Sequence, residues 1–155
     1  MNKQIEWFHK LGATFFYCGY FPGAPGTFTS AVAVFLYWLL QGHVPLYLAG
    51  LGAVTAWGFF SGGVMEKITG RKDPGCVVID EVSGVLISFF LLPPVPKVMW
   101  TAFFLFRAFD MFKIYPANKF ESRHGGTGIM LDDIVAGVYT NLVMHVAIRL
   151  TGIQF

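Results

Sequence analysis

Charged residues are scarce in this chain, at 13% of its 155 residues. A soluble domain carries about 25%. Apolar residues make up 55%, and a chain this short cannot hide so much apolar surface, because small domains bury a modest share of their area. The composition, with a mean hydropathy of +0.58, therefore favours membrane residence over a soluble domain with an unusually apolar core.

Cysteine and net positive charge are also scarce, which disfavours several classes of protein. Cys18 and Cys76 have no CxxC spacing and no neighbouring metal ligands, so we predict neither a disulfide nor a zinc site. The net charge is only +2 and the basic residues are spread singly, so we expect no nucleic-acid partner. Lys3, Glu6 and Lys10 interrupt the N-terminal segment, so we expect no signal peptide.

Apolar runs predict an all-α fold, a small integral membrane bundle that forms one domain over residues 1–155. A spanning helix needs about 20 apolar residues, and three runs reach that length: 46–65, 76–92 and 129–150. The runs at 28–40 and 98–112 are shorter. We therefore expect four to five membrane-embedded helices. Residues 1–18 mix Trp and Lys in an amphipathic pattern, which predicts an additional interfacial helix.

Basic residues orient the predicted bundle through the positive-inside rule. With the N-terminus in the cytoplasm, the outside segments carry Lys97, and Arg149 lies near the outer end of the last run. The inside segments carry most of the others: Lys3, Lys10, Lys67, Arg71, Lys72, Lys113, Lys119 and Arg123. We therefore expect residues 66–75 and 113–128 to be cytoplasmic loops.

Five acidic residues fall inside the apolar runs, close to the ends that this topology brings to the cytoplasmic face: Asp80, Glu81, Asp110, Asp132 and Asp133. A lone carboxylate costs at least about 2.5–3.5 kcal/mol at the centre of a membrane helix. Like charges repel unless a cation lies among them, and Mg²⁺ binds one or two carboxylates together with phosphate oxygens. We therefore predict a metal site, in preference to ion pairs alone with Arg107, Lys72 or Lys113.

Cationic side chains beside these acids indicate an anionic ligand. Arg107, Asp110 and Lys113 are spaced by three, which places them along one band of a helix. Arg contacts phosphate through two hydrogen bonds, and Lys acts as a point charge. A local Arg107–Asp110 ion pair is the alternative reading. Glycine-rich stretches at 19–27 and 124–128 run into helices whose N-termini favour anions.

Three known phosphate-handling motifs are missing. Neither cysteine begins a Cys-x5-Arg loop, there is no Asp-x-Asp pair of the haloacid dehalogenase kind, and no Gly-Lys-Ser/Thr follows the glycine-rich stretches. The simplest remaining scheme is attack by water with help from a metal, and attack by an aspartate stays open.

Four stretches resemble the bacterial phosphatidylglycerophosphatase A family: 21–27 (FPGAPGT) with Ser30, 78–84 (VIDEVSG), 106–113 (FRAFDMFK) with Pro116, and 124–137 (HGGTGIMLDDIVAG). The resemblance implies Mg²⁺-dependent dephosphorylation of phosphatidylglycerophosphate to phosphatidylglycerol, in glycerophospholipid biosynthesis. It also implies a bacterial inner membrane protein with its active site on the cytoplasmic side.

The resulting hypothesis gives each site residue a role. The metal ligands would be Asp80, Glu81, Asp132 and Asp133, with Asp110 a weaker candidate. The substrate phosphate would be bound by Arg107, Lys113, Thr27, Lys72 and His124. All five acids and Arg107 would be catalytic, and the phospholipid tails would stay in the bilayer. The sequence gives no indication of the oligomeric state.

Two alternative functions remain open at this point. One is a lipid phosphatase with a different headgroup specificity. The other is a small cation transporter or channel, which predicts polar residues through the full membrane depth. The far halves of the runs offer only uncharged or histidine side chains: Ser88, Thr140, Asn141 and His145.

Overall fold

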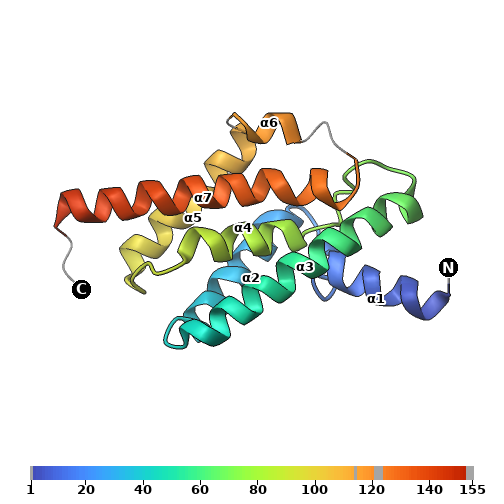
Figure 1. Cartoon of the computed structure of the whole chain (residues 1–155), viewed down its shortest axis with the longest axis horizontal. Coiled ribbons are helices and arrows are strands. Elements are labelled where there is room, and N and C mark those ends of the chain that lie inside the picture. The colour runs from blue at the N-terminus through green and yellow to red at the C-terminus, as the bar shows by residue number, and fades with distance from the viewer. Residues whose placement is uncertain (1, 114, 121–123, 153–155) are drawn as a thin grey trace.

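The structure is a computed structural model that describes residues 2–113, 115–120 and 124–152, with 118 and 120 described by their backbone only. Over these residues the chain is all helical, as the sequence predicts (Figure 1). The elements in order are α1 (Lys3–Ala13), a 3-10 turn η1 (Cys18–Tyr20), α2 (Pro25–Leu40), α3 (Val44–Thr69), α4 (Ile79–Phe89), α5 (Pro96–Phe112), α6 (Ala117–Phe120) and α7 (Gly126–Thr151). Arg123, which we expected on the inner side, lies outside the described residues.

Helix α4 is the centre of the bundle. Helices α2, α3, α5 and α7 all pack against it, and most of its side chains are buried. It has 11 residues, which span about 16 Å at 1.5 Å per residue, whereas the hydrocarbon core of a bilayer is about 30 Å thick. The prediction that residues 76–92 form a spanning helix is therefore wrong. The helix stops at Phe89 because Leu91 takes a left-handed φ of 56° and two prolines follow.

Helices α3 and α7, each of 26 residues, are the described helices long and apolar enough to cross a membrane. Only 22% of the residues in the most apolar stretch of α3, and 28% in that of α7, are buried inside the protein, so most residues there are at least partly exposed. Phe60 and Leu150, for example, are 72% and 82% exposed. Helices α2 and α5 are shorter, at 16 and 17 residues, so two of the described helices are candidate spans by length and composition, and the expected four to five membrane-embedded helices stay a prediction.

The predicted N-terminal helix exists as α1, and it packs along α3. Gly12 lets the two helices approach closely, since a Cβ there would lie 2.3 Å from the Trp57 ring. His9 Nδ1 is 3.1 Å from the buried Ser61 Oγ. The Ile5 and Trp7 side chains remain exposed, as on an amphipathic surface helix.

The two cysteines lie in the segments that precede α2 and α4. Both are free thiols, and burial raises the pKa of the Cys18 thiol.

Candidate active site

Two glycines bring α4 and α7 into backbone contact. The helices run side by side in the same direction, with both N-termini at the same end of the bundle (Figure 1). A Cβ on Gly137 would lie 2.5 Å from the Gly84 carbonyl oxygen, which leaves no room for a larger residue. Asp80 and Asp133 each lie four residues, about one turn, before these glycines. The glycine contact therefore sets the acidic side chains of the two helices beside each other.

Asp80, Glu81 and Asp133 form the centre of the candidate site. One carboxylate oxygen from each lies within 4.8 Å of the others. Asp80 Oδ1, Glu81 Oε2 and Asp133 Oδ2 are buried and have no hydrogen-bond partner. Buried carboxylate oxygens are costly when they lack a counter-charge. A hard divalent cation takes oxygen ligands of this kind, so the three residues fit a Mg²⁺-type ion.

Arg107 is a basic residue whose charge acts on this group through Glu81. A Cβ on Gly26, in the first turn of α2, would lie 2.1 Å from Glu81 Oε1 and 3.7 Å from Arg107 Nη1. The absence of a side chain at Gly26 thus leaves room for both groups. Arg107 Nη1 also donates to Asp110 Oδ2 at 2.6 Å, so the local ion pair considered as an alternative is present. Asp110 is close enough to Glu81 and Asp133 for its charge to act on both.

Asp132 is held by an ion pair with Lys113. Lys113 Nζ donates to Asp132 Oδ2 at 2.8 Å, and the Asp132 side chain is 10% exposed. Among the described residues, Asp132 is not in the group of three carboxylates that could share one ion. The role of Asp132 as a metal ligand therefore stays a prediction, and so does the role of Lys113 as a phosphate binder. The two side chains form an ion pair with each other.

Asp73 is an acidic residue of the site that the sequence analysis missed. It lies in the loop between α3 and α4 with a φ of 47°, and its charge acts on the carboxylates of both Asp80 and Asp132. The sequence signal was weak, because an acid in a polar loop is ordinary, whereas an acid in an apolar run is not.

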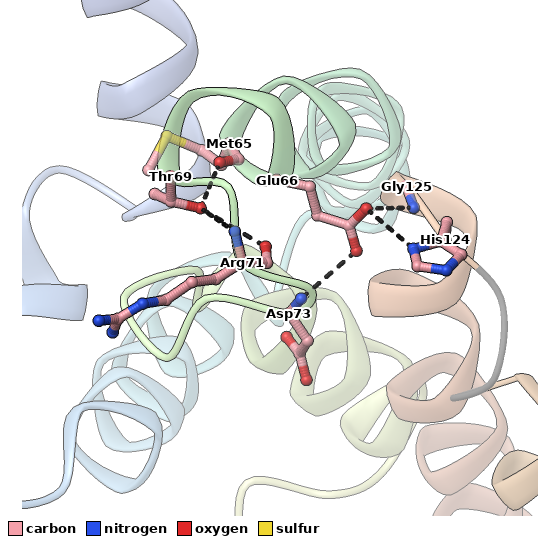
Figure 2. A network of polar contacts seen from close by, with 7 residues as sticks. All are labelled: Met65, Glu66, Thr69, Arg71, Asp73, His124 and Gly125. Carbon is pink, nitrogen blue, oxygen red and sulfur yellow. Dashed lines mark hydrogen bonds and ion pairs between the residues drawn. The ribbon is translucent and has the colours of Figure 1, made fainter.

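Glu66, near the end of α3, links two loops next to the site. Its Oε2 accepts the Gly125 N–H at 2.7 Å, and its Oε1 accepts the Asp73 N–H at 3.3 Å. Figure 2 shows Glu66 between these two partners, with the Asp73 carboxylate pointing away from it. One side chain therefore fixes both the loop that carries Asp73 and the start of α7. Sequence reasoning also missed this residue.

The remaining predicted phosphate binders lie around this centre with fewer contacts. Thr27 is exposed in the first turn of α2, which begins at Pro25 within the stretch expected to be a loop. Lys72 is exposed in the α3–α4 loop, next to Asp73. His124 is 80% exposed, and its Nδ1 lies 3.9 Å from Glu66 Oε2. Their binding of phosphate stays a prediction.

Comparison with known proteins decides the family. Residues 11–148 match the phosphatidylglycerophosphatase A family. The chain belongs to this family. As a member of the phosphatidylglycerophosphatase A family, it is a phosphoric monoester hydrolase. The resemblance seen in the sequence is therefore confirmed.

Three relatives of this family member have similar length. The chain is 36% identical to phosphatidylglycerophosphatase A of Escherichia coli, over 92% of this chain and 84% of the relative. It is 35% identical to phosphatidylglycerophosphatase A of Haemophilus influenzae, over 78% and 77%. It is 36% identical to a putative phosphatidylinositol-3-phosphatase of Bacteroides thetaiotaomicron, over 94% and 96%. No solved structure matches the chain.

Proposed function

We propose that this enzyme hydrolyses the phosphate monoester of phosphatidylglycerophosphate, with Mg²⁺, to give phosphatidylglycerol and inorganic phosphate in phospholipid biosynthesis. The observation that carries the proposal is the group of three carboxylates with unpartnered buried oxygens beside Arg107. Two phosphatidylglycerophosphatases among the relatives support this substrate.

Asp80, Glu81 and Asp133 would hold the ion, and Asp73 and Asp132, whose charges act on the Asp80 carboxylate, would add negative charge around it. When bound, Mg²⁺ withdraws charge from the phosphoryl oxygens and so makes the phosphorus more open to attack. It also removes the repulsion among the acids, which gives the closely spaced carboxylates a stable arrangement.

Arg107 would bind the phosphate, because its guanidinium makes two parallel hydrogen bonds to phosphate oxygens. Asp110 holds the Arg107 side chain in place through the 2.6 Å ion pair. Lys113, which caps the end of α5 and is paired with Asp132, would add positive charge near this end of the helix. Water then attacks phosphorus, the bond from phosphorus to the glycerol oxygen breaks, and that oxygen takes up a proton.

The membrane arrangement completes the proposal. Helices α3 and α7 cross the bacterial inner membrane, and α2 and α5 lie within it beside them, in keeping with their exposed aromatic residues such as Phe35, Trp38 and Phe104. Lys67 in the last turn of α3, and Arg71 and Lys72 in the loop after it, lie at the same end of the bundle as the acids. The positive-inside rule then puts the active site on the cytoplasmic side.

A second substrate is favoured by one observation, the similarity to the putative phosphatidylinositol-3-phosphatase. The deciding experiment measures phosphate release by the purified protein from phosphatidylglycerophosphate, phosphatidylinositol 3-phosphate and phosphatidic acid, in mixed micelles at equal mole fraction. We expect the highest kcat/KM with phosphatidylglycerophosphate. Faster release from phosphatidylinositol 3-phosphate would transfer the assignment to that lipid, and equal rates would show that the headgroup is not selected.

A further inference from the structure

An apolar groove lies between α2 and α5. It has a volume of about 390 Å³ and is open along one side. Its walls include Ala31, Val34 and Trp38 from α2, and Met99, Trp100 and Phe103 from α5. The volume falls in the range of about 300–1,000 Å³ that is usual for small-molecule sites. None of the lining residues is charged, so the groove suits an apolar ligand.

The groove leads to the candidate active site. On α5, the face that carries Met99 and Phe103 also carries Arg107 one turn further on, because the three residues are spaced by four. On α2, Ala31 lies one turn beyond Thr27 on the same face. The two helices are still adjacent at that end, because a Cβ on Gly26 would lie 3.7 Å from Arg107 Nη1. The walls of the groove are thus the same helix faces that carry the phosphate-binding end.

The length and the apolar lining of the groove fit one fatty acyl chain. Along α5, the distance from Arg107 to Pro96 at the far end of the groove is about 16 Å at 1.5 Å per residue. A lipid whose phosphate is bound at Arg107 has its glycerol next to the mouth of this groove. An acyl chain that enters the groove replaces contact with bulk lipid by contact with a fixed apolar wall.

We propose that the α2–α5 groove binds one acyl chain of the phospholipid substrate and thereby makes the enzyme prefer long-chain lipids to short-chain analogues. This inference rests on the proposed function of the adjacent site. A second groove, between α5 and α7, has a similar volume of about 340 Å³. It lies near the C-terminal end of α7, far from the acids, so it is the natural control.

The test compares two alanines that line the two grooves and are both exposed, Ala31 and Ala147. Ala31→Trp fills the α2–α5 groove, and Ala147→Trp fills the other. Phosphate release is measured from dioleoyl and dibutyryl phosphatidylglycerophosphate in mixed micelles. We expect Ala31→Trp to raise KM for the dioleoyl lipid about tenfold, which equals about 1.4 kcal/mol. Its kcat/KM for the dibutyryl analogue, and both parameters of Ala147→Trp, should stay within about twofold of wild type.

Each other outcome has a definite meaning. An unchanged KM for Ala31→Trp, or an equal loss with both substrates, would overturn the groove as an acyl site. If Ala31→Trp does not fold, Ala31→Leu and a chain-length series on the wild type decide: affinity that does not rise with chain length contradicts the proposal. If the wild type releases phosphate from neither lipid, the proposed function itself fails, and the groove inference falls with it.

Discussion

At the residue scale, the candidate site gathers carboxylates whose negative charges repel one another unless a cation or a proton lies among them. Asp133 is nearly fully buried, and one of its oxygens has no partner. It lies near Asp80, Asp110 and Asp132, so its negative charge meets mainly like charge. A negative charge on such a group would destabilise the folded chain unless a cation or a proton is bound to it.

Asp133→Asn should therefore lower turnover at least about 100-fold, because a neutral amide is a poor ligand for a hard divalent ion. The same change removes one of the repelling charges, so the melting temperature in EDTA should not fall. Phosphate release and thermal unfolding in detergent check the two results. Glu6→Gln on α1 is the control and should keep wild-type activity. Near wild-type turnover of Asp133→Asn would remove Asp133 from the site.

Glu66 gives a second test at this scale. Glu66→Ala removes the acceptor for both the Gly125 and the Asp73 N–H groups. Loss of a residue that orients metal ligands typically lowers metal affinity or activity 10–100-fold. We therefore expect kcat to fall, or the Mg²⁺ concentration that gives half activity to rise, by about 10-fold or more. KM for the lipid should change little. Glu66→Gln keeps one acceptor oxygen and should fall in between.

The neighbouring Lys67 is exposed, so Lys67→Ala is the matched control. A general loss of stability in Glu66→Ala, with unchanged kcat and Mg²⁺ response in the folded fraction, would contradict the positioning role.

The sequence predicted the acids in apolar runs but not those in loops. Asp80, Glu81 and Asp133 are conspicuous because charge is costly in an apolar helix. Asp73 and Glu66 lie in or beside polar segments, where acids are common, and only the fold brings them to the site. The pairing of Asp132 with Lys113 joins residues 19 positions apart, across two helices, and spacing alone does not predict it.

At the element scale, the contact between α4 and α7 positions the acids. Gly137→Ala should separate the two helices, because its Cβ would lie 2.5 Å from a backbone oxygen. We expect a loss of about 1–3 kcal/mol in the free energy of unfolding and a clear loss of activity. Gly52 on α3 has nothing within 4 Å of a Cβ, so Gly52→Ala is the matched control and should be neutral or stabilising by up to about 1 kcal/mol. Equal effects of the two variants would contradict this role of the glycine contact.

The helices themselves were largely predictable, but the role of α4 was not. An apolar run indicates burial without showing whether lipid or protein surrounds it. Helix α4 is apolar because other helices cover it, whereas α3 and α7 are apolar over faces that point outward. The prolines after Phe89 were visible in the sequence as helix breakers. The left-handed backbone at Leu91, which ends the helix earlier than the apolar run, could not be seen in the sequence.

At the scale of the whole molecule, the site acids lie at the same end of the bundle as the basic loop between α3 and α4, and we assign this end to the cytoplasm. Lys67 lies in the last turn of α3, at the site end, and Lys97 lies in the first turn of α5, at the opposite end; both are exposed. In a background with Cys18 and Cys76 replaced by alanine, a Lys97→Cys variant should react with a membrane-impermeant maleimide in intact spheroplasts. A Lys67→Cys variant should react only after the membrane is opened. The reverse pattern would invert the topology.

We propose above all that the Asp80, Glu81 and Asp133 carboxylates give this chain a Mg²⁺-dependent lipid phosphatase activity. The most direct measurement is phosphate release from phosphatidylglycerophosphate by the purified protein in detergent, first in EDTA and then with Mg²⁺ added in excess. We expect no release in EDTA and full release once Mg²⁺ is in excess, whereas Asp80→Asn and Asp133→Asn should lose release under both conditions. Release in EDTA at the same rate as with Mg²⁺, from a folded sample, would contradict the proposal.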